Sequence, residues 1–114
     1  MSLSIQEEKA KDITVLKVGG FVDTSTSSSL EDSIKGLHDT KKTKVIIDLA
    51  GVEFISSAGW GILVAYLRKM RSAGGDIKLT SMVEKVDNVF KLMEFDSLID
   101  AYPTLDKAVK SFDD

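Results

Sequence analysis

The feature that most constrains the fold of this chain is a short apolar run followed closely by its strongest helical pattern. The run at 45–49 lies between a lysine-rich stretch and a glycine, which is typical of a buried central strand. The helical pattern spans about 57–73 and ends at Gly74-Gly75, as helices commonly end at glycine. A buried strand that leads into a helix favours a parallel or mixed sheet with helices packed on it.

The helix expected at 57–73 has two different faces. With about 100° of rotation per residue, its large apolar side chains fill one wide arc, namely Ile62, Leu63, Tyr66, Leu67 and Met70. Small and charged side chains occupy the other arc, namely Gly61, Ala65, Arg68, Lys69 and Ser72. We therefore expect the first arc to be buried against the sheet and the second to face solvent.

The rest of the chain alternates strand and helix patterns. A weak strand pattern at 3–8 and a stronger one at 13–19 flank a polar break at 9–12 that suits a hairpin. A polar loop at 23–29 precedes a helix with apolar positions at Leu30, Ile34 and Leu37. Further patterns indicate a strand at 77–80 and then a helix with an apolar stripe of Val86, Val89, Phe90 and Met93. A strand at 98–102 follows, and a last helix starts at Pro103 and has on one face Leu105, Ala108, Val109 and Phe112. The predicted fold class is α/β, in the order ββαβαβαβα, with a mixed sheet of four to five strands and about four helices packed on it.

Composition narrows the classes of protein that this chain can be. Its 114 residues suit one domain over 1–114, with a core of about 4–112. The absence of cysteine excludes disulfides, thiolate zinc sites and a cysteine nucleophile. A net charge of −3 without a basic block is unlike that of a nucleic-acid-binding protein. No apolar run approaches about 18 residues and the start lacks a signal-peptide pattern, so we expect a cytoplasmic protein without membrane insertion.

The turn before the strong helix departs from ordinary helix composition. Gly59 and Gly61 lie in the first turns of the helix, where each glycine costs about 1 kcal/mol relative to alanine. They either allow tight packing against the sheet or keep a surface open to another molecule. Ser56 and Ser57 lie where an N-cap is expected, so a helix cap is the simplest role for Ser57. Trp60, at the margin of the buried arc, is either a core-edge residue or an anchor for a partner.

Two motifs resemble the signature of STAS domains, the family of the anti-sigma factor antagonists. The stretch 45–63, VIIDLAGVEFISSAGWGIL, resembles the family's buried strand ending in Asp-Leu, which is followed by a short loop, a serine-containing turn and a helix. The stretch 20–23, GFVD, resembles the family's motif after the second strand. The order of elements matches that of the family from about 4 to 112, which is nearly the whole chain.

The resemblance implies roles for particular residues. It places the phosphoacceptor on Ser57, the acidic loop residue on Asp23 and the strand-end aspartate on Asp48. It also implies a partner surface over the loop, the turn and the exposed helix arc, made of Asp23, Thr24, Ser56, Gly59, Trp60, Gly61, Ala65 and Arg68. Family members often have aspartate where this chain has Ser56, so Ser56 is a competing acceptor and the identity of the kinase stays open. For Asp23 the alternative role is to cap the loop that follows it.

The resemblance implies a regulatory module rather than an enzyme. A module of this kind binds an anti-sigma factor serine kinase, is switched off by phosphorylation and is reset by a serine phosphatase, with no cofactor, metal or nucleic acid. We expect a monomer or a weak dimer. The single histidine, His38, is expected at the solvent-exposed end of a helix, which leaves Ser57 without a motif for a catalytic base. Two other functions stay open: an accessory subunit that docks on a transporter ATPase and, with less support, a domain that binds a nucleotide or another small ligand.

Overall fold

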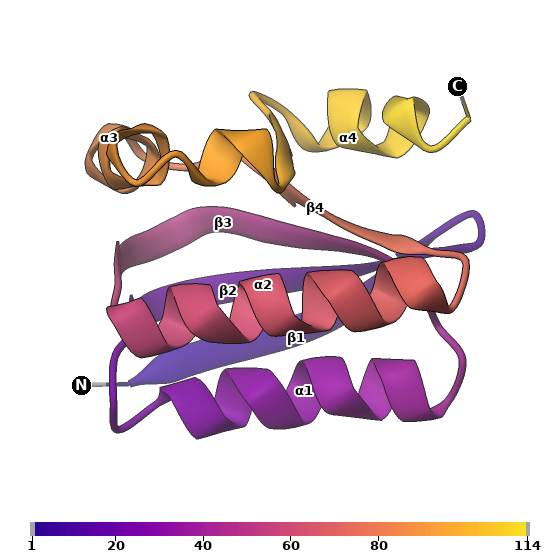
Figure 1. Ribbon diagram of the computed structural model, residues 1–114, viewed down its shortest axis with the longest axis horizontal. Helices are drawn as coiled ribbons and strands as arrows, with labels where there is room; N and C mark the ends of the chain where they lie inside the picture. The colour runs from indigo at the N-terminus through magenta and orange to yellow at the C-terminus, as the bar shows by residue number, and fades with distance from the viewer. Residues whose placement is uncertain (1, 114) are drawn as a thin grey trace.

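The sheet and its helices follow the predicted order. The computed structural model describes residues 2–113 of the chain (Figure 1). The strands are β1 (Leu3–Ala10), β2 (Ile13–Val22), β3 (Lys44–Ile55), β4 (Asp76–Thr80) and β5 (Asp100–Tyr102). The helices are α1 (Ser27–Asp39), α2 (Ser57–Ser72), α3 (Glu84–Leu92) and α4 (Leu105–Ser111), with a short 3₁₀ helix η1 (Phe95–Ser97). The predicted α/β class is therefore confirmed.

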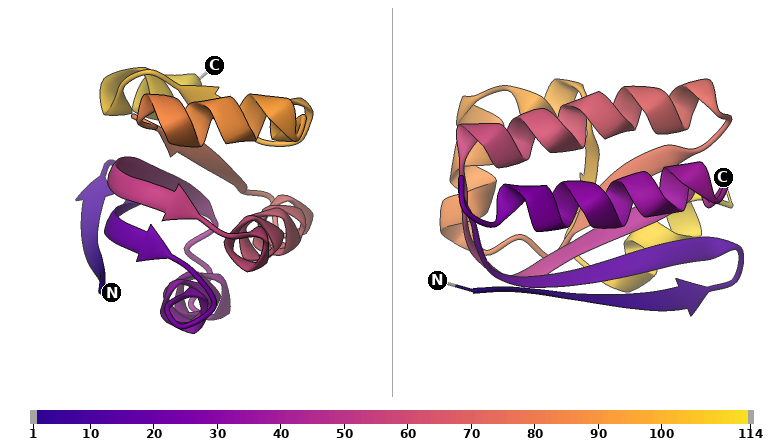
Figure 2. Two further views of the ribbon diagram at one scale, coloured as in Figure 1. Left: turned by 90° about the vertical axis from the view of Figure 1, so that its left-hand side faces the viewer. Right: turned by 90° about the horizontal axis from the view of Figure 1, so that it is seen from below.

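The strands form one mixed sheet in the order β1-β2-β3-β4-β5. β1 and β2 are an antiparallel hairpin, as expected, whereas β2, β3, β4 and β5 are parallel neighbours. α1 and α2 lie on one face of this sheet and α3 and α4 on the other (Figures 1 and 2). Because parallel strands end at the same edge, the loops that follow β2 and β3 lie side by side at one end of the domain.

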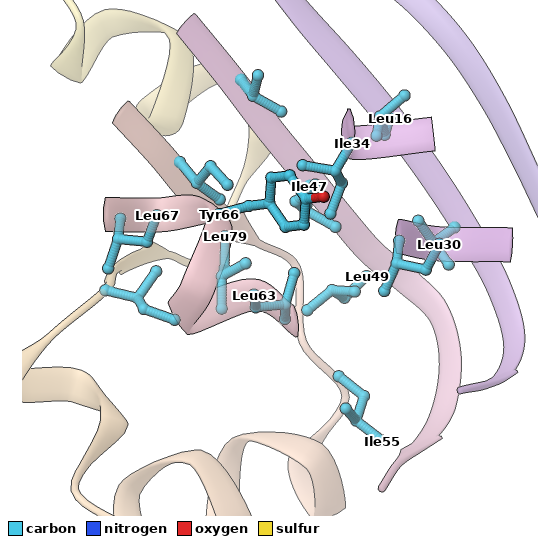
Figure 3. Close-up of a cluster of buried hydrophobic side chains, with 14 of the residues drawn as sticks. Leu16, Leu30, Ile34, Ile47, Leu49, Ile55, Leu63, Tyr66, Leu67 and Leu79 are labelled. Carbon is cyan, nitrogen blue, oxygen red and sulfur yellow. The ribbon is translucent and has the colours of Figure 1, made fainter. Parts of the chain in front are cut away.

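The larger core lies mainly between the sheet and helices α1 and α2 (Figure 3), and it extends to Val86 and Phe90 of α3. Most of the apolar positions predicted for these helices are buried, namely Leu30, Ile34 and Leu37 of α1 and Leu63, Tyr66, Leu67 and Met70 of α2. Ile62, which was predicted in the same arc of α2, is only partly buried. Each such side chain stabilises the fold by roughly 1.5–3 kcal/mol relative to an exposed one. A second, smaller cluster lies under α4 and consists of Ile13, Val15, Ile46 and Ala108. The helix faces predicted from periodicity are therefore the faces that hold the domain together.

β3 is longer than the sequence predicts. The expected strand ends at residue 49, yet β3 continues to Ile55 and stays paired with β2, with two register shifts on the way. The two strands come very close where Gly19 and Gly51 meet. A Cβ on Gly51 would lie only 3.1 Å from the Gly19 Cα, so the absence of a side chain permits this approach. Asp48 consequently lies inside β3, at the last position paired with β4, and the expectation that it ends the strand is wrong.

The C-terminal part of the chain differs from the prediction in three details. The stripe expected on α3 is only half buried, since Val86 and Phe90 are buried but Val89 and Met93 are exposed. The strand expected at 98–102 is reduced to Asp100–Tyr102, because η1 precedes it. α4 begins after Pro103 rather than at it, because the Thr104 hydroxyl accepts a hydrogen bond from the Lys107 N–H at 3.2 Å and so forms the N-cap. Over residues 2–113, no helix combines the length and apolar character that a membrane span requires.

Candidate functional site

The candidate site lies where β2 and β3 end and helices α1 and α2 begin (Figure 1). The turn from β3 into α2 is joined to the end of β2 by a hydrogen bond from the Ser56 N–H to the Val22 carbonyl oxygen at 2.7 Å. This bond holds the start of α2 next to the loop that carries Asp23. The structure therefore brings together the two motifs that lie some thirty residues apart in the sequence.

Ser56, not Ser57, is the N-cap of α2. Its backbone is extended and its Oγ accepts a hydrogen bond from the Gly59 N–H at 3.2 Å. Ser56 is also partly buried, whereas Ser57 is the first residue of the helix and is exposed. The cap considered for Ser57 is therefore wrong by one residue, and the Ser57 hydroxyl is open to solvent.

The Asp23 carboxylate organises the loop between β2 and α1. Its Oδ1 accepts hydrogen bonds from the Ser25 hydroxyl at 2.6 Å, the Ser25 N–H at 2.9 Å and the Thr26 N–H at 3.1 Å. These bonds, led by that from the Ser25 hydroxyl, lower the pKa of Asp23 below its ordinary value. The Thr26 hydroxyl in turn donates to the Phe21 carbonyl oxygen at 2.7 Å. The loop-cap role of Asp23 is thus realised, with an ionised carboxylate at the corner where α2 begins.

Thr26 is a site residue that the sequence analysis missed. It is buried, and its hydroxyl links the loop to the end of β2. The signal for it was its position three residues after Asp23, which is the spacing of a capping motif. Thr24, which was predicted to contact a partner, lies in the same loop and is exposed.

The outward face of α2 forms a continuous exposed stripe. Its members lie on one side of the helix at spacings of three or four residues and are Ser57, Gly61, Ala65, Arg68 and Ser72. A Cβ added to Gly61 would meet nothing within 4 Å, so this part of the stripe is open space. With a rise of about 1.5 Å per residue, Arg68 lies about 16 Å along the helix from Ser57 and is too far away to contact its hydroxyl.

Two residues expected on the partner surface are buried instead. A Cβ on Gly59 would lie 2.6 Å from Val22 Cγ1 and 2.9 Å from Ile55 Cγ2, so this glycine allows α2 to pack closely on the sheet. Trp60 is only 3% exposed, and its ring stacks on that of Phe95 with the centroids 5.0 Å apart. Gly59 and Trp60 are therefore packed within the domain, and the prediction that they contact a partner is wrong.

Two other candidates lie away from the corner. Asp48 lies seven positions before Ile55 in β3, which is about 23 Å along the strand. The Asp48 carboxylate accepts a hydrogen bond from the Ala50 N–H at 3.0 Å. His38 lies in the last turn of α1, at the opposite end of that helix from the Asp23 loop. The described residues thus offer Ser57 no histidine base within hydrogen-bond reach, and no group of three acidic or histidine side chains among them could hold a metal ion.

Comparisons with known proteins agree with this geometry. The model of the STAS domain family matches residues 4–108. The anti-sigma-F factor antagonist RsfB of Mycobacterium tuberculosis is 33% identical over 69 residues, which cover 60% of this chain and 57% of that protein. BtrV of Bordetella bronchiseptica is 22% identical over 110 residues, covering 96% and 95%. The crystal structure of an anti-sigma factor antagonist from Mycobacterium paratuberculosis superimposes with a TM-score of 0.91 at 28% identity, covering 99% of this chain and 96% of that one.

Proposed function

The chain belongs to the STAS domain family, and we propose that it is an anti-sigma factor antagonist that phosphorylation of Ser57 switches off. The observation that carries the proposal is the exposed Ser57 hydroxyl at the start of an open helix stripe. In this role the unphosphorylated domain binds an anti-sigma factor serine kinase through the Asp23 loop and the outward face of α2. A serine phosphatase then restores the binding-competent form.

The two adjacent serines differ in their availability to a kinase. The Ser56 Oγ is engaged with the Gly59 N–H, and the Ser56 side chain is partly buried. Phosphorylation there would remove the cap of α2. Ser57 has an exposed side chain and no part in the cap, so its hydroxyl can enter a kinase active site while the helix stays intact. This difference favours Ser57 as the acceptor.

A phosphate on Ser57 would change the surface without unfolding the domain. It adds about −1.5 to −2 charges at the N-terminus of α2, where backbone N–H groups and the helix dipole favour an anion. The Asp23 carboxylate lies in the neighbouring loop, so the corner would then carry two negative groups. A partner that fits closely against Gly61 and its surroundings would be displaced by both the bulk and the charge of the phosphate.

Affinity capture with controlled phosphorylation tests the proposal. The wild-type chain, Ser57→Ala and Ser57→Asp are immobilised and exposed to a lysate of the organism that makes the chain. We expect the wild type and Ser57→Ala to retain a kinase of the anti-sigma type, and Ser57→Asp to retain at least about tenfold less. Addition of ATP and magnesium should release that kinase from the wild type but not from Ser57→Ala. Release from both forms, or from neither, would contradict the proposal.

Ser57→Asp is a suitable mimic of phosphorylated Ser57 because the variant should fold normally. The first turn of α2 contains no acidic residue, so a carboxylate at this exposed position should stabilise the helix by about 0.3–1 kcal/mol. Capture of a transporter ATPase that transfers no phosphate to the chain would instead favour the role of an accessory subunit.

A further inference from the structure

A cleft lies between α3 and the segment that runs from η1 to Pro103. This part of the domain is on the face of the sheet opposite α1 and α2 (Figure 2). The cleft encloses about 530 Å³, which is within the roughly 300–1,000 Å³ usual for small-molecule sites. None of its described lining residues belongs to the stripe that begins at Ser57, so the cleft is separate from the candidate site on α2.

The cleft lies at the carboxyl ends of two parallel strands. Met82 lies two residues after the end of β4 and Pro103 comes directly after β5, and both line the cleft. In open α/β sheets, ligands commonly bind in a crevice beyond the carboxyl ends of the strands. The position of the cleft in the fold is therefore one that suits a ligand.

The apolar lining of the cleft is held in place by the core. Phe90 and Ile99 are only 2% and 1% exposed. The Phe90 ring also packs against Trp60, with the ring centroids 5.8 Å apart. Because these side chains are fixed by packing, the wall that they form is already in place before any ligand binds. The full apolar lining is Met82, Phe90, Ile99, Ala101, Tyr102 and Pro103.

The charged lining of the cleft is mainly acidic. It consists of three carboxylates and one lysine, a net charge of −2, from Asp87, Asp96, Asp100 and Lys91. Lys91 lies 2.9 Å from Asp87 and so already has a partner. Among the described residues, Asp96 and Asp100 have no lysine or arginine within 4.0 Å. The cleft thus combines an apolar, partly aromatic wall with two carboxylates that lack a cation.

One further cation lies near Asp100 in the sheet but does not line the cleft. Lys78 is the β4 partner of Asp100 in the strand register. Its ammonium is directed to α4, where it donates to the Ser111 hydroxyl at 2.7 Å and lies 4.4 Å from the centre of the Phe112 ring. Lys78 is therefore engaged elsewhere and leaves the Asp100 carboxylate to a ligand.

We propose that this cleft is a second binding site, for a small organic cation: a primary ammonium or guanidinium group on an apolar or aromatic body. The cation lies against Asp96 and Asp100, where opposite charges attract, and the body packs on Phe90 and Tyr102, whose rings also favour a cation nearby. An organic anion is repelled by the net charge of the lining. A wholly polar cation leaves the apolar wall without a contact.

Three matched compounds test the site, because they share a phenyl ring and a four-carbon chain. 4-Phenylbutylamine ends in an ammonium, 4-phenylbutanol in a hydroxyl and 4-phenylbutanoate in a carboxylate. Each is titrated into the ¹⁵N-labelled protein, and the amide shifts are followed by NMR. We expect the amine to shift residues 87–91 and 96–102 saturably, to bind at least about fivefold more tightly than the alcohol, and to weaken as salt is added. The carboxylate should shift none of them.

Variants separate the charge of the cleft from its shape. Asp96 and Asp100 are both exposed, so Asp96→Asn and Asp100→Asn together should leave the melting temperature nearly unchanged. The double variant should bind the amine about tenfold more weakly, because it loses two charged acceptors, and should bind the alcohol as the wild type does. Asp32→Asn, the same change on exposed α1, is the matched control and should bind all three compounds as the wild type does.

Several results would overturn the proposal. These are absence of saturable shifts with the amine, equal binding of the carboxylate, shifts confined to α1 and α2, and unchanged amine binding in the double variant. A capped leucine–arginine–leucine tripeptide that binds the cleft more tightly than the amine would also overturn it, because the occupant would then be a protein segment rather than a small molecule.

Discussion

Gly59 and Gly61 lie two residues apart in the first turns of α2, yet only Gly59 contacts the rest of the domain. A Cβ on Gly59 would collide with Val22 and Ile55, whereas one on Gly61 would meet nothing within 4 Å. The same contrast holds for their neighbours, since Trp60 is buried and Ser57 is exposed. The inward face of the first turns of α2 is therefore constrained by packing, whereas residues on the outward face can be substituted or modified without disturbing that packing.

This comparison gives a physical reason why the proposed phosphorylation of Ser57 would leave the domain folded. The inward face joins α2 to the ends of β2 and β3 and to the Phe95 ring, so it determines where Ser57 is held. The outward face has open space around Gly61, so charge or bulk added there should change partner binding far more than the free energy of unfolding. If the two faces are as distinct as the structure indicates, substitutions on them should separate stability from binding.

The largest expected effect is at Trp60. Trp60→Ala removes a buried ring that contacts Phe95 and Phe90, and we expect it to lower the free energy of unfolding by about 3–5 kcal/mol in urea titrations followed by circular dichroism. Trp60→Phe should lose much less, because it keeps a ring in the stack and removes an indole N–H that has no acceptor among the described residues. A loss of under about 1 kcal/mol for Trp60→Ala would show that the ring is not part of the core.

The pair of glycines gives the next largest effect. Gly59→Ala should lower the free energy of unfolding by about 1–3 kcal/mol, because its methyl group overlaps Val22 and Ile55. Gly61→Ala is the matched control and should raise it by about 0.5–1 kcal/mol, because alanine favours an exposed helix position. Similar values for the two variants would mean that the two faces of α2 are not distinct at this point.

The adjacent serines should differ by about 1 kcal/mol. Ser56→Ala removes the N-cap hydrogen bond to Gly59 and should destabilise the domain by about 0.5–2 kcal/mol. Ser57→Ala, at an exposed position outside the cap, should change stability by under about 0.5 kcal/mol. Thermal unfolding of both variants under the same conditions measures the difference. The reverse order would place the cap on Ser57.

The smallest expected effect on stability accompanies the largest effect on binding. Ala65→Arg adds a long side chain in the middle of the exposed stripe, so the melting temperature should stay nearly unchanged, with under about 0.5 kcal/mol lost. Binding of the captured kinase should be abolished, because the side chain prevents close approach to α2. A calorimetric scan of the isolated variant is the control, and marked destabilisation there would show that Ala65 packs within the domain.

Much of the fold could be predicted because the relevant signals are local. The apolar period of α2 identified its buried face, and the short apolar run identified the start of β3. The extension of β3 could not be foreseen, because residues 50–55 look like a loop until Gly19 of β2 is known to face Gly51. The position of β3 thus depends on pairing with a strand that is distant in sequence.

The site shows the same limit. Its general location followed from the motifs, but the assignment of the cap to Ser56 rather than Ser57 depends on a helix boundary, which sequence patterns fix only within one or two residues. The sequence left Trp60 open between a core-edge residue and a partner anchor, because Phe95, the residue on which its ring stacks, comes from η1, far along the chain. Whether a residue at the margin of a helix's apolar arc is buried depends on such distant contacts, which the apolar periodicity of the sequence does not predict.

The central claim is that Ser57, at the start of the exposed side of α2, is the phosphoacceptor. Phosphopeptide mapping tests this claim most directly. The wild type, Ser56→Ala and Ser57→Ala are each treated with a serine kinase of the anti-sigma type and ATP, and the phosphate on each serine is quantified by mass spectrometry. The account predicts that the phosphate is mainly on Ser57 in the wild type, is retained in Ser56→Ala and is lost in Ser57→Ala. A majority of the phosphate on Ser56, or persistence of phosphorylation in Ser57→Ala, would contradict it.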